Sequence, residues 1–320
     1  MNSKIEDSIA QNLVQGFCGK SKLVISKNFQ AFGFTRQTIK EKINSLRKQK
    51  IIKNITININ PHIRPDYLKY ILLEIKTNPT EPKLVNNLLK IPQIKMLDGI
   101  FGEFSLIALL IFKSSDEYFK VLKKIDEIMA NSYFKKYQII ETIKVYKTNG
   151  IDLKDKIVEK DFKLDENDYK ILKILQENQG IKPISTYEIK DLLMEFSNIE
   201  ISQSTVHNRI KILEQKGVIL NYSISFNPRK IGFNGKYLLR IKPKNTSKYD
   251  HFAEDLARKE EITDLFRIGE QYGLFAIVRV KKIEDYAAFI RDLYNSEEIE
   301  DTFTNFVLDE LKPYTNFLVF

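Results

Sequence analysis

The sequence predicts an α+β protein made of two winged helix-turn-helix domains and two ferredoxin-like βαββαβ domains, arranged in tandem as two copies of one unit. Three observations support this prediction. The chain repeats itself at a nearly constant offset. Each copy opens with segments of helical periodicity, and each closes with alternating strand and helix patterns. The chain's 320 residues are enough for several small domains.

The repeat extends over most of the chain. The stretch Thr35–Leu46 matches Ser202–Leu213 at an offset of 167, and Gly102–Glu103 matches Gly269–Glu270 at the same offset. Beyond these pairs the offset becomes 168. A constant offset across helices, strands and turns indicates internal duplication. The predicted domains are a helix-turn-helix at 1–61, a βαββαβ domain at 62–148, a charged linker at 149–163, a helix-turn-helix at 164–228 and a βαββαβ domain at 229–320.

Capping patterns predict where the helices of each copy begin. Ser3–Glu6 and Ser185–Glu188 match the capping box, and Asp165 is a suitable N-cap for the first helix of copy 2. The third helix begins at Thr35 in copy 1 and at Ser202 in copy 2, and apolar residues follow at helical spacing. Three short helices before a strand pair predict a helix-turn-helix whose third helix enters the major groove.

The polar face of the third helix is the candidate DNA-binding surface. Residues 35–53 contain seven basic residues and one acidic residue, whereas residues 202–220 contain three basic residues and one acidic residue. Amide and guanidinium groups read base edges, and Lys and Arg meet phosphates. The candidate residues are Arg36, Gln37, Thr38, Lys40, Lys42, Asn44, Arg47 and Lys48 in copy 1, and Gln203, Ser204, Thr205, His207, Asn208, Arg209 and Lys211 in copy 2.

Strand patterns follow each third helix. Apolar and polar residues alternate over 54–59 and over 221–226, which indicates half-buried strands, and we expect a hairpin wing in each copy. The βαββαβ pattern then occupies 70–146 in copy 1 and 237–308 in copy 2. The strand at 106–111 is apolar on both faces, so we expect the sheet of the other copy to cover its second face.

The chain resembles the leucine-responsive regulatory protein (Lrp/AsnC) family. The resemblance rests on Leu164–Leu172, Ser202–Ile219 and Arg267–Tyr272, and it extends over nearly all of copy 2. It implies sequence-specific binding of double-stranded DNA, pairing through effector (RAM-type) domains, and a small-molecule effector. Gly273 and Ser105 stand where the family commonly has an acidic residue. The effector-associated turn residues that the resemblance implies are Gly102, Glu103, Phe104, Gly269, Glu270, Gln271 and Tyr272.

Composition and charge limit which kinds of partner, compartment and cofactor the sequence is compatible with. The formal charge of +9 suits a polyanionic partner, and Cys18 is the single cysteine. The sequence has neither a long apolar run nor an apolar signal core after its polar start, so we expect a cytoplasmic protein without membrane contact. We expect no metal, cofactor or catalytic residue. The apolar tail Phe317–Phe320 suggests a further contact within or between chains, and we expect a homo-oligomer.

Two other functions remain open. Siroheme decarboxylases have a similar architecture, and such an enzyme is expected to use histidine and arginine around a tetrapyrrole. The three histidines, His62, His207 and His251, lie away from the turn and third strand where that chemistry is expected. The weaker charge of the second recognition helix favours the other alternative, an effector-binding assembly protein that does not bind DNA.

Overall fold

The computed structural model describes residues 36–63, 68–78, 81–159, 161–177, 179–180 and 183–317. The predicted Ser3–Glu6 capping box, the first two helices of copy 1, the Thr35 cap and Cys18 fall outside these residues. The chain divides into two compact units. The helical segments of both copies form the first unit, and the βαββαβ segments of both copies form the second.

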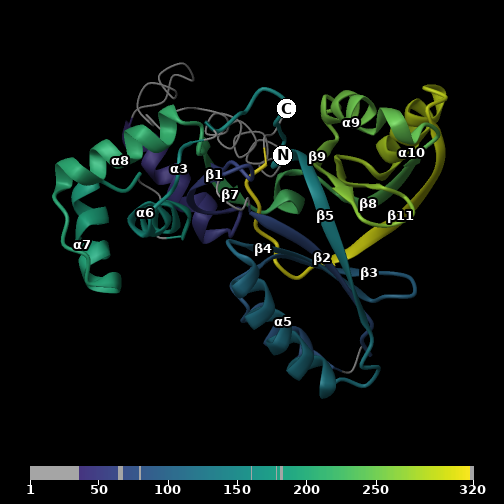
Figure 1. Cartoon of the computed structure of the whole chain (residues 1–320), viewed down its shortest axis with the longest axis horizontal. Helices are drawn as coiled ribbons and strands as arrows, with labels where there is room; N and C mark the ends of the chain where they lie inside the picture. Colours follow the sequence, from purple (N-terminus) through teal and green to yellow (C-terminus); the bar gives the residue numbers. More distant parts are fainter. Residues whose placement is uncertain are drawn as a thin grey trace. The chain divides into compact units, whose positions relative to one another are not determined.

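The first unit, which we call the helical unit, is shown in Figure 1. Among the described residues it contains five elements of copy 2 and two elements of copy 1. The predicted caps of copy 2 are present. Ser185 and Glu188 form a reciprocal capping box, and the Ser202 hydroxyl accepts from the backbone N–H of Thr205. The elements are α3 (Arg36–Lys48), β1 (Ile52–Ile59), α6 (Glu166–Glu177), α7 (Thr186–Ser197), α8 (Gln203–Gln215), β7 (Ile219–Phe226) and the 3-10 turn η1 (Pro228–Ile231).

The two strands of this unit pair with each other. β1 of copy 1 runs antiparallel to β7 of copy 2, with Ile57 opposite Tyr222. The prediction of a separate hairpin wing in each copy is therefore wrong. Each strand needs a hydrogen-bonding neighbour along its edge, and that neighbour comes from the other copy.

The C-terminal segment completes this two-stranded sheet. Asn58 Nδ2 donates to Asn221 Oδ1 at 2.8 Å, and Asn316 Nδ2 donates to Asn58 Oδ1 at 2.7 Å. Phe317 is buried, and its ring packs edge-on against Phe226 with 5.0 Å between centroids. The contact predicted for the apolar tail is thus made within the chain at Phe317, while residues 318–320 are outside the described range.

The second unit, which we call the effector unit after the effector domains predicted from the sequence, repeats one order of elements twice. Each copy has the strand order 4-1-3-2 of a split βαβ arrangement, namely β5-β2-β4-β3 and β11-β8-β10-β9. Copy 1 contains β2 (Lys69–Ile75), α4 (Pro82–Leu89), β3 (Ile94–Ile100), β4 (Leu106–Phe112), α5 (Ser115–Ala130), β5 (Tyr137–Thr148) and β6 (Ile151–Asp152). Copy 2 contains β8 (Gly235–Pro243), the 3-10 turn η2 (Thr246–Lys248), α9 (Tyr249–Ala257), β9 (Ile262–Ile268), β10 (Leu274–Val280), α10 (Ile283–Asn295) and β11 (Ile299–Glu310).

The last strand of each copy is shared between the copies. Residues 137–141 of β5 pair with β2 of the same copy, and residues 142–147 pair with β9 of copy 2. Residues 299–306 of β11 pair with β8, and residues 307–310 pair with β3 of copy 1. These pairings link eight strands into a closed ring, which removes the exposed edges of both sheets.

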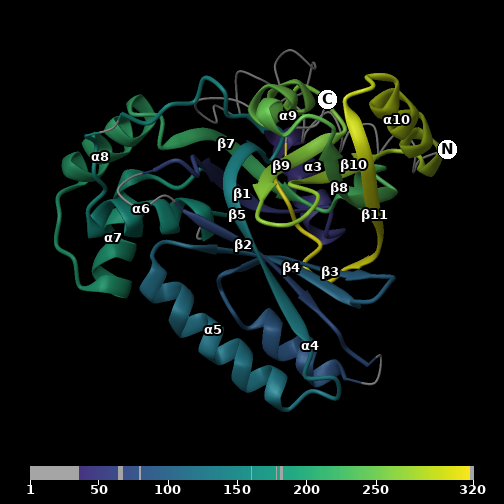
Figure 2. The ribbon, with the colours of Figure 1, turned by 45° about the vertical axis from the view of Figure 1, so that its right-hand side comes forward.

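Helices cover the outer face of the ring (Figure 2). α4 and α5 pack on β3 and β4, and α9 and α10 pack on β9 and β10. The inner face is filled by both copies, since Tyr70 of β2 packs against Phe266 of β9 with 5.8 Å between ring centroids. This agrees with the prediction that the other copy covers the second face of the apolar strand β4. The α+β class is likewise confirmed.

The segment predicted as a linker begins with ordered pairing. β6 continues a hairpin from β5, with Thr148 opposite Ile151, and the Gly150 N–H donates to the carbonyl of Thr263. Asn149 and Gly150 have positive φ, as a tight hairpin turn requires. The Asn-Gly pair, interpreted from sequence as the start of a linker, therefore closes a hairpin. The other predicted boundaries along the chain stay predictions.

We expect Phe317→Ala to lower the free energy of unfolding of the helical unit by about 3–5 kcal/mol, because it removes a buried ring and leaves a cavity against Phe226. Chemical denaturation followed by circular dichroism measures the change. Phe101→Ala is the matched control, because the Phe101 side chain is 81% exposed. Equal stability of the two variants would show that the tail does not stabilise the sheet.

Candidate DNA-binding and effector sites

Helix α8, the predicted recognition helix of copy 2, is held in place by an ionic contact with α6. Arg209 Nη1 lies 2.7 Å from Asp165 Oδ2 and 2.8 Å from Asp168 Oδ1. Asp165 and Asp168 also exchange hydrogen bonds with each other's backbone N–H at the start of α6. The two carboxylates and their hydrogen bonds raise the pKa of Arg209. Arg209, predicted from sequence to lie near phosphate, is thus engaged in positioning α8 against α6.

The remaining candidates on α8 fall into two sets. Gln203 Nε2 donates to Thr186 Oγ1 of α7 at 2.5 Å, and Thr205 is bonded to the Ser202 cap. The Gln203 contact fixes the N-terminal turn of α8 against the preceding helix, and the Ser202 contact caps α8 itself. Four of the candidates on α8 have exposed side chains, namely Ser204, His207, Asn208 and Lys211.

Copy 1 presents a more basic set on α3. Gln37 is exposed, and its Nε2 donates to Glu41 Oε1 at 2.7 Å. Lys42 is half-buried on the same helix. Asn44, Arg47 and Lys48 are exposed toward the C-terminal end of α3. The side chains of Arg36, Thr38 and Lys40 are outside the described set, although their backbone belongs to the helix.

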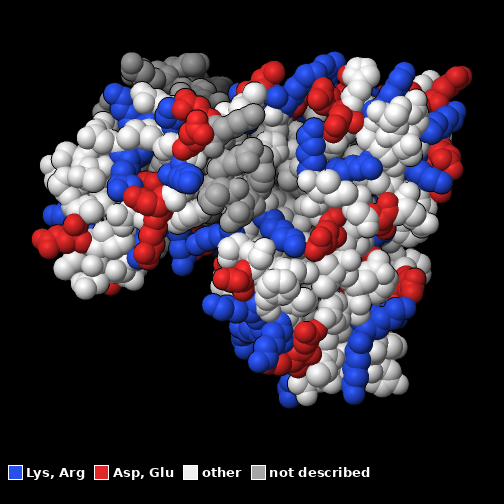
Figure 3. All heavy atoms as spheres, in the orientation of Figure 1, with Lys and Arg blue, Asp and Glu red and all other residues white. Residues whose placement is uncertain are grey.

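Charge is mixed on the surface seen in Figure 3, where basic and acidic side chains are interspersed over α7 and α8. Among the residues that the structure describes, no cluster of His, Cys, Asp and Glu is suited to hold a metal ion. Within the same residues, no helix is both long enough and apolar enough to cross a membrane.

The turn between the second and third strands corrects one detail of the predicted alignment. The Ile100 N–H donates to Ser105 O, and the Ile268 N–H donates to Gly273 O. Both turns therefore close at an offset of 168. This register makes Gly102 equivalent to Glu270, and Glu103 equivalent to Gln271, so the Gly-Glu pairs matched in sequence are one residue out of register.

The two turns consequently differ in their contacts. Glu270 is half-buried, with Oε1 2.9 Å from Arg240 Nε, and burial raises the pKa of its carboxyl group. Glu103 is exposed, and its carboxylate lies 2.5 Å from Lys136 Nζ. Glu270 therefore faces the interior of the ring, whereas Glu103 remains at the surface.

The other turn residues are arranged around neighbouring strands. The Gly269 N–H donates to Glu141 O at 3.0 Å, and the Tyr272 hydroxyl donates to Asp301 Oδ2 at 3.2 Å. Phe104 is buried beside Lys136, while Gln271 and Gly102 are exposed. The turn of copy 2 is thus tied to β5 and β11.

Gly273 has a structural reason to replace the acidic residue that is common in the family. Its φ is +80°, which side chains rarely adopt, and a Cβ atom here would lie 2.8 Å from ring atoms of Tyr249. The guanidinium carbon of Arg267 lies over the same ring, 3.3 Å from its centroid. Tyr249 and Arg267 therefore occupy the space beside this turn.

Sequence reasoning missed a set of charged side chains inside the ring. A period-two strand pattern shows which residues share a face, but it does not show which face is enclosed by the other copy. Lys236 and Arg240 share one face of β8, a spacing that was visible in the sequence. This set consists of six buried residues: Glu74, Asp98, Lys236, Arg240, Arg279 and Glu310.

Comparison with known proteins agrees with this architecture. The model of the Lrp/AsnC ligand binding domain matches residues 237–317. The HTH-type transcriptional regulator FL11 of Pyrococcus abyssi is 33% identical over 153 residues, which are 48% of this chain and 94% of that protein. This chain belongs to the Lrp/AsnC family. The HTH-type transcriptional regulator Ptr1 of Methanocaldococcus jannaschii is 32% identical over 40% of this chain and 80% of that protein.

A solved structure matches the Lrp/AsnC chain over both copies. The siroheme decarboxylase NirDL aligns with a TM-score of 0.61 at 14% identity, and the alignment covers 96% of this chain and 92% of that chain. At this level of identity the likeness concerns the fold. The regulators named above correspond to about half of the chain, whereas this structure extends over nearly all of it.

We expect Arg209→Ala to destabilise the helical unit by about 1–3 kcal/mol, because it leaves the largely buried carboxylate of Asp168 without its cation. The midpoint of urea unfolding measures this loss. Lys211→Ala, two residues along the same helix and exposed, is the control and should leave the midpoint unchanged. A midpoint for the Arg209 variant that equals the control would remove the positioning role of this residue.

Proposed function

We propose that this chain is a sequence-specific DNA-binding transcription regulator built from tandem helix-turn-helix and effector domains. The observation that carries the proposal is the similarity to helix-turn-helix regulators over 94% of the length of FL11. The exposed polar faces of α3 and α8 support it, since each belongs to a helix whose opposite face is buried. The partner is double-stranded DNA.

The two recognition helices are proposed to contribute differently. α3 offers Asn44, Arg47 and Lys48 on its exposed face, with Arg36 and Gln37 at its start. α8 offers neutral groups together with Lys211. Since cations contribute most of the phosphate affinity, copy 1 anchors the protein and copy 2 adds a different preference for bases.

A small-molecule effector at the turns after β3 and β9 is a further part of the proposal, and it rests on the match to the family's ligand binding domain. Association of chains into homo-oligomers and a cytoplasmic location remain expectations of the same kind. Light scattering at micromolar concentration and cell fractionation are the direct measurements for these two expectations.

We expect Lys48→Ala to weaken binding to all DNA sequences alike and to reduce the slope of log affinity against log salt by about 1. Fluorescence anisotropy over a range of salt concentrations measures both effects. Lys123→Ala is the matched control, since Lys123 is exposed on α5 in the effector unit. Arg36→Ala should instead relax preference at one base position. The reverse assignment of the two effects would contradict the proposed DNA-facing side of α3.

In vitro selection of DNA should yield asymmetric sites, because α3 and α8 present different hydrogen-bonding groups to base edges. The two half-sites should lie about 10 base pairs or a multiple apart if both helices contact DNA. The selected sequences are to be aligned without imposed symmetry. A palindromic site, together with unchanged binding by a variant that replaces Gln203, His207 and Lys211, would assign DNA binding to copy 1 alone.

An enzyme acting on a tetrapyrrole is the second candidate, and the fold shared with the siroheme decarboxylase NirDL over 96% of this chain favours it. His207 and His251 are exposed on α8 and α9, and His62 follows β1. A spectroscopic titration with iron uroporphyrin tests binding, and incubation with siroheme, followed by assay for loss of carboxyl groups as carbon dioxide, tests turnover. Saturable binding with turnover would replace the regulator proposal, whereas an effector-binding protein without DNA affinity would bind neither DNA nor tetrapyrrole.

A further inference from the structure

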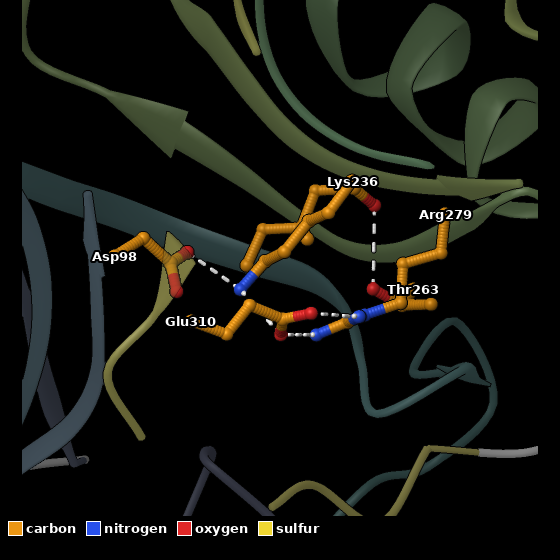
Figure 4. A network of polar contacts seen from close by, with 6 residues as sticks. Asp98, Lys236, Thr263, Arg279 and Glu310 are labelled. Atoms are coloured by element: carbon orange, nitrogen blue, oxygen red, sulfur yellow. Dashed lines mark hydrogen bonds and ion pairs between the residues drawn. The ribbon is translucent and has the colours of Figure 1, made fainter. Parts of the chain in front are cut away.

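The interior of the effector unit joins the two copies through opposite charges. Arg240 Nη2 of copy 2 lies 2.6 Å from Glu74 Oε1 of copy 1, and both side chains are at most 6% exposed. Lys236 Nζ of copy 2 lies 2.5 Å from Asp98 Oδ2 of copy 1, and these side chains are at most 5% exposed (Figure 4). Each carboxylate thus comes from copy 1, and each cation comes from copy 2.

Glu74 and Arg240 occupy the same position in their respective copies. Glu74 on β2 stands opposite Ile107 of β4, and Arg240 on β8 stands opposite Phe275 of β10. Ile107 and Phe275 are each two residues beyond the equivalent turns, so they correspond as well. A contact between equivalent residues lies on the pseudo-twofold axis that relates the copies. In a symmetric pair of identical copies, each of these residues would contact the same residue of the other copy.

The ion pair between Lys236 and Asp98 has no charged counterpart at the equivalent position on the other side of the ring. The same register makes Lys236 equivalent to Tyr70, and Asp98 equivalent to Phe266. Tyr70 and Phe266 pack ring against ring at 5.8 Å. One side of the ring therefore joins the copies through an ion pair, and the related side joins them through two aromatic rings.

Further charges reinforce this asymmetry within copy 2. Glu310 of β11 lies opposite Asp98 in the register, and its carboxylate is 2.6 Å from Arg279 Nη2 and 3.4 Å from Lys236 Nζ (Figure 4). The equivalent of Glu310 on β5 is Val145, which stands opposite Phe266. The carboxylates of Asp98 on β3 and Glu310 on β11 lie opposite each other. Their charge is therefore balanced by the two cations of copy 2, Lys236 and Arg279.

We propose that these buried charges commit copy 1 to pair with copy 2 and exclude pairing between two like copies. Two copies of type 1 would bury Glu74 against a second Glu74, with Asp98 beside a tyrosine. Two copies of type 2 would bury Arg240 against a second Arg240, with Lys236 beside a phenylalanine. An uncompensated buried charge is strongly destabilising, so only the unlike pair is stable. This inference concerns assembly and does not rest on DNA binding.

A charge-reversal cycle in the full-length chain tests the proposal. We expect Arg240→Glu to lower the melting temperature by about 10 °C or more, since it places a third carboxylate beside Glu74 and Glu270. Glu74→Arg should lower it less, because Glu270 partly neutralises the second guanidinium. The double variant E74R/R240E conserves the net charge of the cluster and should recover at least half of the loss caused by R240E.

The matched control is an exposed pair on neighbouring strands of copy 2. Lys242 and Glu300 lie 2.7 Å apart with side chains 42% and 52% exposed, so K242E, E300K and their double variant should change the melting temperature little. Additive losses in E74R/R240E, with no recovery, would overturn the proposal. If R240E does not accumulate as folded protein, recovery of folded yield in the double variant is the same test.

A second measurement addresses the choice of partner directly. Full-length E74R and R240E chains, carrying different affinity tags, are co-expressed and purified through both tags. Exchange of copies between these chains places opposite charges at both axial contacts, so the two-tag complex should melt above either variant alone. A two-tag complex that melts like its components would show that these charges do not select the partner.

Discussion

The effector unit depends on the division of β5 and β11 between two partners. Each strand begins against the first strand of its own copy and ends against the second strand of the other copy. Backbone hydrogen bonds are obligatory in a buried sheet, so neither copy satisfies its last strand alone. Closure of the ring, its enclosed interior and the restriction of helices to the outer face all follow from this division.

Enclosure of the ring interior in turn shifts the pKa values of the charged residues that it buries. Burial raises the pKa of Asp98, and the nearby Lys236 opposes this shift. At the rim, burial lowers the pKa of Lys147 to about 8, and its ammonium group donates to the carbonyl of Lys259. Charged side chains are retained in such an interior where a partner of opposite charge or a backbone acceptor is supplied. In this unit the partner is often supplied by the other copy.

Much of the fold was accessible from the sequence because its signals are local. Capping chemistry predicted that α7 begins after Ser185, and hydrophobic periodicity predicted the βαββαβ order of elements in both copies. Pairing between distant segments was not accessible, since β1 and β7 carry the same alternating pattern that a hairpin would show. The candidate recognition surface was predicted as a helix face, but the ionic contacts of Arg209 depend on helix packing that periodicity does not specify.

The shared strands also constrain how such a gene is able to change. Unequal recombination between two similar halves would generate chains with one or three copies. A single copy would need a second chain to pair the second half of its last strand, and a third copy would leave one strand end open. A chain that closes its ring alone should therefore keep an even number of copies. The two copies in such a chain are free to diverge as long as a change of charge at the axis in one copy is balanced by a change of opposite sign in the other copy.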